Sequence, residues 1–163
     1  MRNAVRRTSS GVARPAAQYA ALPWRRRRGN SIEILLVTTR RTGRWIVPKG
    51  WPVHGCSPRE CAAREAMEEA GVLGVIAESP IGAFPYQKRR KSGESVRCRV
   101  EVFPLKVTHQ MRDWPEKSVR EVCWCPVEDA LARTSDPGLR RLIAKFAEAS
   151  SEPQKPGAAK AAA

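Results

Sequence analysis

The sequence predicts a mixed α/β domain of the α+β type, with a mixed β-sheet covered by helices on both faces. Short runs rich in Val, Ile and Leu, bounded by turn residues, recur along residues 18–125 and indicate strands. One strongly helical segment interrupts these runs, and two more helical segments close the domain. Strands placed around a central helix need cover on both faces of their sheet, which favours a layered arrangement.

The first strands are expected at residues 18–22, 32–39 and 44–47. Pro23 is expected to end the first strand, and the second is rich in Ile, Leu and Val, which is typical of a strand buried on both faces. The segment Pro48-Lys49-Gly50-Trp51-Pro52 is then expected to be a loop, because two prolines and a glycine disfavour regular structure.

The clearest element is a helix over residues 58–70. Ser57 suits the N-cap, Pro58 suits the first helical position, and Glu60 stands three residues after the cap, as in a capping box. Good helix formers follow until Gly71, which suits the left-handed residue that ends many helices.

The second half of the domain contains strand, loop and helix signals in turn. Strands are expected at 72–85, with a bend at Ser79-Pro80, at 96–107 and at 119–125, with a basic loop at 88–93 and helices at 127–132 and 137–149. Asp136, followed by a proline, is expected to cap the last helix.

The two ends differ from the middle in composition. Residues 1–17 are predicted to be a disordered basic arm and residues 150–163 a disordered tail, which leaves one domain at 18–149. The net charge is +14, and no acidic residue precedes Glu33. A basic body suits an anionic small molecule. A nucleic-acid-binding protein is an alternative that depends only on the arm, so no specific nucleic-acid partner is expected.

The apolar runs are all shorter than the ~18 residues of a membrane-spanning helix, so no membrane partner is expected. The five cysteines are an odd number, and no secretory signal precedes them. These features favour reduced thiols and a cytoplasmic location, although the acid-free start with Arg and Ser also resembles an organellar transit peptide. The sequence contains no signal of oligomeric state.

Three acidic side chains gather on the predicted central helix. At 100° per residue, Glu65, Glu68 and Glu69 fall within roughly one third of its circumference. Each such like-charge pair costs about 0.2–0.5 kcal/mol, and a bound divalent cation would remove the repulsion. Oxygen ligands on a rigid element suit Mg²⁺, with Mn²⁺ as an alternative. An ordinary solvated helix face, with Arg64 paired to Glu60 and Glu68, is the other interpretation.

Residues 50–72 resemble the Nudix box, in which a Gly, five residues, a Glu and seven residues precede Arg-Glu-apolar-x-Glu-Glu-x-Gly-apolar. The positions that match are Gly50, Arg64, Glu65, Glu68, Glu69, Gly71 and Val72. The similarity extends over about residues 18–148, and Arg44-Trp45-Ile46-Val47-Pro48 and Trp124 resemble the diphosphoinositol polyphosphate and diadenosine polyphosphate phosphohydrolase branch. The resemblance implies a Nudix-like α/β/α sandwich with the Nudix loop-helix.

The resemblance also implies a role for each matching residue. Glu65, Glu68 and Glu69 would be catalytic and would bind Mg²⁺, and Gly50 would let the loop backbone approach the metal. Arg64 would orient the loop and the glutamates, with Gly71 as structural support. The implied reaction is metal-dependent hydrolysis of a phosphoanhydride bond in a nucleoside diphosphate linked to another moiety, a dinucleoside polyphosphate or a diphosphoinositol polyphosphate. The alternative is a Nudix-fold sensor that binds such a ligand without cutting it.

Two positions depart from the box pattern. Cys56 stands where the first Glu is expected, and Ala66 replaces a larger aliphatic residue. Glu60, one helical turn before Arg64, is predicted to take over the ion pair that the missing glutamate would supply.

Basic residues near the box are predicted to hold the substrate phosphates. Lys49 directly precedes Gly50, and Lys88, Arg89, Arg90 and Lys91 lie in the basic loop, of which Arg89 and Arg90 are the chosen candidates. Proton transfer from the attacking water also needs a general base. The candidates are Glu65, Glu116 and Glu121.

Overall fold

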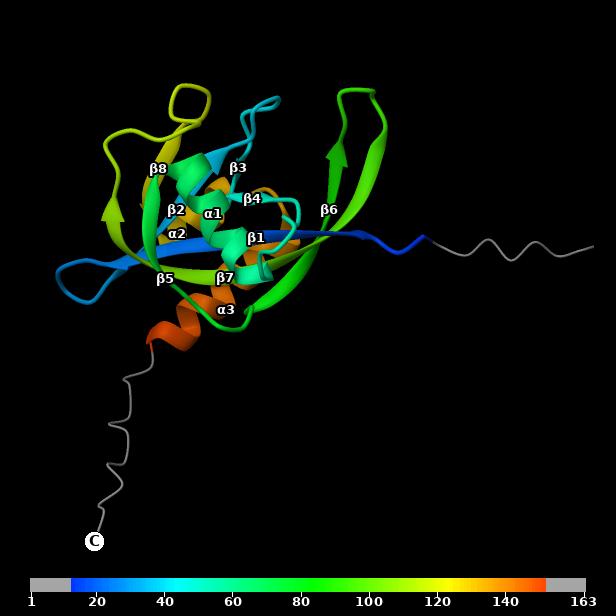
Figure 1. Cartoon of the computed structure of the whole chain (residues 1–163). Helices are drawn as coiled ribbons and strands as arrows, with labels where there is room; N and C mark the ends of the chain where they lie inside the picture. Colours follow the sequence, from blue (N-terminus) through cyan, green and yellow to red (C-terminus); the bar gives the residue numbers. More distant parts are fainter. Residues whose placement is uncertain (1–12, 152–163) are drawn as a thin grey trace, which may run out of the picture.

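The computed structural model describes residues 13–151, and within that range it contains one eight-stranded mixed β-sheet with helices around it (Figure 1). The main path of the sheet runs β3-β2-β1-β7-β5; in addition β4 pairs with β1, β6 with β7 and β8 with β2. The bounds are β1 Ala16–Arg26, β2 Ile32–Thr38, β3 Trp45–Ile46, β4 Lys49–Gly50, α1 Pro58–Ala70, β5 Val72–Ile76, β6 Gly82–Arg89, β7 Ser95–Gln110, β8 Val122–Pro126, α2 Val127–Arg133 and α3 Pro137–Ser151.

The centre of the sheet is the parallel pair of β1 and β7, in register from Ala16↔Cys98 to Trp24↔Lys106. The other strand pairs of the described chain are antiparallel. β2 is buried along its whole length, as its apolar sequence predicts. The predicted mixed sheet is therefore confirmed.

The expected end of the first strand at Pro23 is wrong, because β1 continues to Arg26. The backbone N–H of Ala21 donates to Pro48 O at 3.0 Å. Pro23, two residues later, faces the same edge of β1, where pairing with β2 begins only at Trp24. The N–H that proline lacks therefore costs the sheet no ladder bond.

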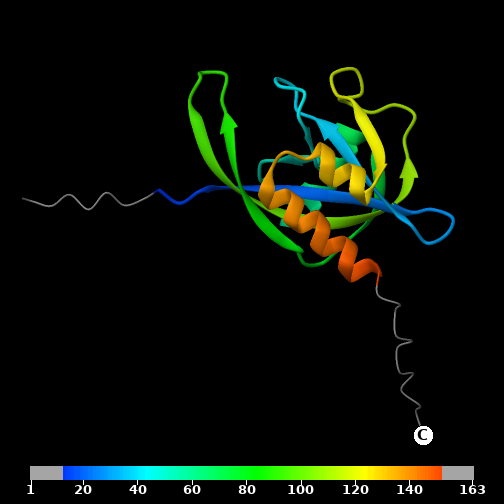
Figure 2. The same cartoon turned by 180° about the vertical axis from the view of Figure 1, so that it is seen from behind.

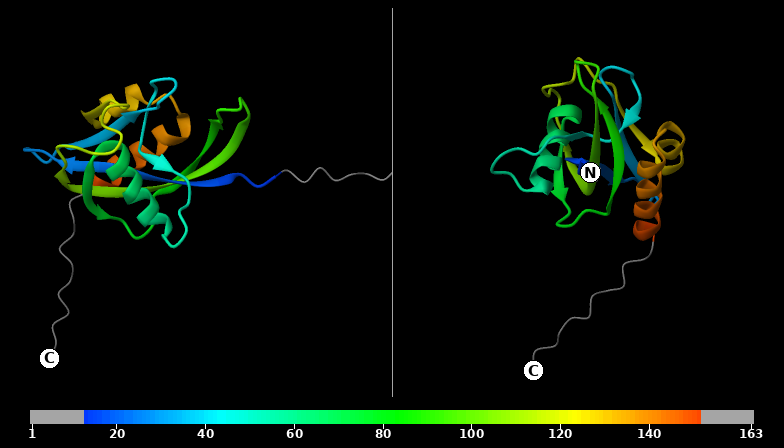
Figure 3. Two further views of the ribbon diagram at one scale, coloured as in Figure 1. Left: turned by 45° about the horizontal axis from the view of Figure 1, so that its top comes forward. Right: turned by 90° about the vertical axis from the view of Figure 1, so that its right-hand side faces the viewer.

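Helices cover both faces of the sheet. α1 packs on one face, and α2 and α3 pack on the other (Figures 2 and 3). The buried side of α1 consists largely of alanines, including Ala62, Ala66 and Ala70, which lets the helix backbone lie close to the sheet. Ala66, the small residue in the box, is fully buried. The predicted α/β/α layering is confirmed.

Two predicted segments differ in detail. The strand expected at 72–85 is two strands, β5 and β6, which pair with different halves of the long β7. The loop expected at 48–52 contains the short strand β4, which pairs with Tyr19 and Ala20 of β1. This pairing holds the box loop against the sheet and directs Gly50 toward α1.

The β6–β7 hairpin extends beyond the rest of the sheet (Figure 1) and carries the basic residues 88–91. The outermost elements begin at Ala16 and end at Ser151, slightly beyond the predicted limits of 18 and 149. Most of the predicted arm and tail, residues 1–12 and 152–163, lies outside the described residues. No helix of residues 13–151 has the length and apolarity needed to cross a membrane.

Candidate functional site

The helix that carries the box glutamates is defined at both ends by local contacts. Ser57 is its N-cap, and the capping box between Ser57 and Glu60 is complete. Gly71 ends the helix with a φ of 65°, and a Cβ there would lie 2.4 Å from the ring of Trp114. Glycine is therefore needed at position 71 for two reasons: it adopts the left-handed conformation easily, and it leaves room for the ring of Trp114 in the following loop.

The predicted ion pair between Glu60 and Arg64 is wrong. Glu60 Oε2 accepts hydrogen bonds from the Ser57 N–H and the Ser57 hydroxyl, both at 2.7 Å. Arg64 Nε instead donates to Glu68 Oε1 at 2.6 Å. A capping box directs the third helical residue back toward the N-terminus, so the carboxylate of Glu60 cannot also serve Arg64.

We expect Glu60→Ala to lower the free energy of unfolding, because the capping box loses the hydrogen bonds that Glu60 accepts from Ser57. Because Glu60 touches none of the box glutamates, kcat per folded molecule should not change. Urea unfolding and steady-state kinetics measure the two effects separately. Glu78→Ala is the matched control, since the side chain of Glu78 is 92% exposed. An equal loss of stability in both variants would contradict the capping role.

Gly50 and Glu65 are in very close contact. A Cβ at position 50 would lie 1.8 Å from Glu65 Oε1, so only glycine leaves room for this carboxylate beside the loop backbone. Burial raises the pKa of Glu65, and the nearby charges of Glu68 and Glu116 raise it further. The pairing of β4 with β1 thus places the box loop directly against a partly desolvated carboxylate.

Glu69 is the most buried carboxylate of the helix, with 6% of its surface exposed. Its oxygens accept hydrogen bonds from the Lys49 N–H at 3.3 Å and from Arg120 Nη2 at 2.6 Å. Burial raises the pKa of Glu69 to about 8, although Arg120 acts in the opposite direction. A buried carboxylate of this kind is stabilised by any positive charge that comes close to it.

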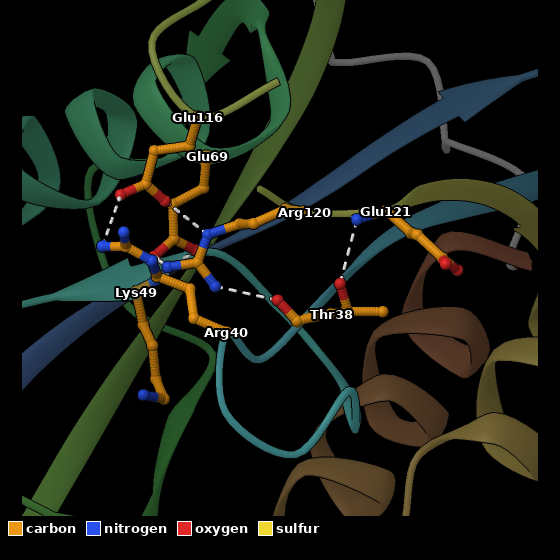
Figure 4. A network of polar contacts seen from close by, with 7 residues as sticks. All are labelled: Thr38, Arg40, Lys49, Glu69, Glu116, Arg120 and Glu121. Carbon is orange, nitrogen blue, oxygen red and sulfur yellow. Dashed lines mark hydrogen bonds and ion pairs between the residues drawn. The ribbon is translucent and has the colours of Figure 1, made fainter. Parts of the chain in front are cut away.

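Arg120 is a central residue that no motif in the sequence indicated (Figure 4). Its guanidinium donates to Glu69 on α1, to Glu116 on the loop before β8, and to Thr38 O at the end of β2, the last at 2.8 Å. The Glu116 N–H donates in turn to Glu68 O at 3.0 Å. Because these partners are far apart in the sequence, no spacing pattern could have indicated the cluster.

The two loop candidates for the general base lie differently. Glu116 belongs to the same network as Glu69, whereas the side chain of Glu121 is directed away from it (Figure 4). Glu121 takes part through its backbone, whose N–H donates to Thr38 Oγ1 at 2.9 Å. The carboxylate that joins the box glutamates is therefore that of Glu116.

Glu65, Glu68 and Glu69 share one helix but have separate contacts. Glu68 is held by Arg64 on the outer side, while Glu65 and Glu69 face Gly50 and Arg120. In the part of the chain that the structure describes, no three acidic, histidine or cysteine side chains enclose a common point. The cluster thus presents its oxygens around the box loop without closing into a cage.

The structure brings two lysines to the box loop. Lys49 Nζ lies 3.9 Å from the ring centre of Tyr86, and Lys88 Nζ lies 4.7 Å from that of Trp51. Burial lowers the pKa of Lys49 to about 8, with the charge of Lys88 acting in the same direction. Arg89 follows Lys88 and so faces the other side of β6, and Arg90 begins the turn after the strand. Of the cations of the basic loop, the structure thus brings Lys88 to the box loop, while the roles of Arg89 and Arg90 in substrate binding stay predictions.

A cleft lies beyond Tyr86, the aromatic ring under Lys49 Nζ. A cavity of about 580 Å³ is lined by Arg44, Phe84, Tyr86 and Asp136, among others. A smaller cavity of about 190 Å³ shares Arg44, Tyr86 and Asp136 with it and also contacts Trp45. Tyr86, which lines both cavities, links them to the box loop, because Lys49 Nζ lies over its ring; no box glutamate lines either cavity.

A family model described as NUDIX domain matches residues 16–146 of this chain. The chain belongs to the NUDIX domain family. The NUDIX match covers almost the whole described structure, from the first residue of β1 to α3. The recognition made from the box residues is confirmed.

Curated relatives of this NUDIX chain come from plants and animals. It is 33% identical over 120 residues to Nudix hydrolase 12, mitochondrial, of Arabidopsis thaliana, which is 72% of this chain and 59% of the relative. It is 40% identical over 103 residues to diphosphoinositol polyphosphate phosphohydrolase 3-alpha of Mus musculus, which is 61% of this chain and 58% of the relative. The chain therefore spans less than two thirds of the length of these relatives.

Solved structures show the same fold. A Caenorhabditis elegans Ap4A hydrolase in a binary complex superposes with a TM-score of 0.61 at 22% identity, covering 82% of this chain and 96% of that one. The NUDIX domain of Shewanella oneidensis NrtR, complexed with ADP ribose, gives a TM-score of 0.64 at 18% identity, covering 88% and 94%. At these identities the similarity establishes the NUDIX fold.

NUDIX hydrolases generally use divalent metal ions, and the residues of this chain fit such an ion. The available donors are carboxylate oxygens, which hard cations prefer. The space that a Cβ at Gly50 would fill is occupied by Glu65 Oε1, so the loop backbone and a ligand carboxylate already lie together. The buried carboxylate of Glu69 already binds one cation, the guanidinium of Arg120, so the space beside it suits positive charge.

Proposed function

We propose that this chain hydrolyses a phosphoanhydride bond in an anionic small molecule and depends on Mg²⁺, with Mn²⁺ as a substitute. The observation that carries this proposal is the packing of two partly desolvated carboxylates, Glu65 and Glu69, around the backbone of the box loop at Lys49 and Gly50. Membership of the NUDIX family supports it.

Each residue of the site has a distinct task in this reaction. Glu65, Glu68 and Glu69 would hold the ion, which when bound neutralises the diphosphate and lowers the pKa of a coordinated water. Glu116, on the loop that packs against α1, is placed to accept a proton from the attacking water. Lys49 supplies positive charge from the box loop to the phosphates.

The cleft beyond Tyr86 is proposed to take the part of the substrate that does not react. Its volume of about 580 Å³ falls in the range of about 300–1,000 Å³ that is usual for ligand sites. The aromatic rings and arginines of the cleft suit a nucleoside or another phosphorylated group. Names of relatives and neighbours, which mention diphosphoinositol polyphosphate, Ap4A and ADP ribose, support this range of substrates.

A substrate panel tests the proposal directly. The protein is incubated with diadenosine polyphosphates, ADP-ribose, nucleoside triphosphates and diphosphoinositol polyphosphates, with Mg²⁺, Mn²⁺ or EDTA, and the products are separated and quantified. We expect turnover of at least one diphosphate that stops in EDTA and returns with the metal. Binding of these ligands without turnover would favour a Nudix-fold sensor and would contradict the enzyme.

A further inference from the structure

We propose that Arg120 is the internal counter-ion of the carboxylate cluster, and that a divalent metal ion competes with it for Glu69. This inference builds on the proposed function, because it concerns the same carboxylates. It adds a residue that the box pattern does not contain. It also predicts that the protein binds metal less tightly with Arg120 than without it.

The contacts of Arg120 place its charge at the centre of the cluster. Its guanidinium reaches Glu69, Glu116 and the Thr38 carbonyl at the same time, and thereby joins α1, the loop before β8 and the end of β2 (Figure 4). The side chains of Arg120 and Glu69 are 10% and 8% exposed. A planar donor group in such a position is held in one orientation by its three partners.

The metal ion and the guanidinium cannot both neutralise Glu69 at close range. An arginine does not lose its proton in a protein, so its charge stays when a second cation arrives. Two cations that share one buried carboxylate repel each other strongly, because the surroundings screen them poorly. Since Glu69 Oε1 is held by Arg120 at 2.6 Å, a metal ion bound to that oxygen would lie close to the guanidinium, and the repulsion between the two cations favours withdrawal of the guanidinium.

The structure offers Arg120 a place to withdraw to. The side chain of Glu116 is 27% exposed, and Arg40 Nη1 lies 3.7 Å from its carboxylate. Glu116 is therefore closer to solvent than Glu69 is. A guanidinium that leaves Glu69 can keep its contact with Glu116 and donate to an incoming anion. Metal and anionic substrate would then favour each other's binding, since the substrate stabilises the withdrawn arginine.

A second buried glutamate provides a matched control away from the site. Glu33 is 6% exposed, like Glu69, and it is paired with Arg25 at 2.7 Å and with Arg27 at 3.2 Å. A purely structural ion pair of this kind should affect stability and leave metal affinity unchanged. Removing Arg25 and removing Arg120 should therefore differ only in their effect on metal binding.

The test is a titration with Mn²⁺ alone, in which electron paramagnetic resonance measures the free ion. We expect Arg120→Gln to bind Mn²⁺ about tenfold more tightly than the wild type, which corresponds to about 1.4 kcal/mol. Arg25→Gln should bind it as the wild type does. Thermal unfolding should show a lower Tm for metal-free Arg120→Gln and a larger rise on adding Mn²⁺.

Unchanged or weaker Mn²⁺ binding by folded Arg120→Gln would overturn the competition between the two cations. If that variant does not fold without metal, Arg120→Lys decides instead. Its single ammonium cannot join three partners, so it should bind Mn²⁺ more tightly than the wild type, and equal or weaker binding would overturn the inference. A wild-type protein that binds no Mn²⁺ contradicts the proposed function itself, which keeps the two failures distinguishable.

Discussion

Replacing Glu69 with glutamine is expected to lower kcat by about 100-fold or more. Even the outer partners of metal ligands contribute roughly 10–100-fold to affinity or activity, so loss of a direct ligand should exceed that. Glu69 is also the carboxylate that the Lys49 N–H and Arg120 contact, and glutamine keeps its shape while removing its charge. The protein should remain folded, because Arg120 keeps its contacts with Glu116 and with Thr38 O in this variant.

The measurement is steady-state turnover at saturating Mg²⁺, with circular dichroism to verify the fold. Glu78→Gln makes the same chemical change at an exposed glutamate and should leave kcat unchanged. If Glu69→Gln lost less than about threefold in kcat, the buried carboxylate would not be a metal ligand and the proposed chemistry would fail.

Substituting Gly50 with alanine is expected to abolish most of the activity and to weaken Mn²⁺ binding strongly. The added Cβ would lie 1.8 Å from Glu65 Oε1 and 2.2 Å from its Cδ, so the carboxylate and the loop must separate. The carboxylate is the far end of a flexible side chain, so it can move away at little cost in stability, but it then leaves the box loop. The effect arises from contact with Glu65, because Gly50 lies in a strand and does not need a left-handed conformation.

Gly55→Ala is the control for this variant. Gly55 has a φ of 80°, and a Cβ at that position would have no neighbouring atom within 4 Å, so alanine there strains the backbone without touching Glu65. Gly55→Ala should lose stability in urea unfolding and keep its Mn²⁺ affinity, whereas Gly50→Ala should lose Mn²⁺ affinity. Wild-type kinetics in Gly50→Ala would show that the glycine is not needed to bring the loop to the carboxylate.

The helix and its ends were predictable because their causes are local. Ser57, Pro58 and Gly71 act through contacts within a few residues, and the observed helix has the predicted bounds. The apolar run of β2 indicated burial on both faces in the same way. The continuation of β1 through Pro23 was not predictable. A strand tolerates a proline only where no neighbouring strand needs the missing N–H, and that depends on where β2 begins to pair with β1.

The spacing of the box by itself determined the family and put Glu65, Glu68 and Glu69 on one face of a helix, since helical geometry converts spacing into position. Only the tertiary structure decided what those carboxylates contact. Arg120 meets Glu69 from 51 residues away, and Lys88 reaches the box loop from a separate hairpin. Such contacts depend on how the sheet orders its strands, which no local spacing specifies.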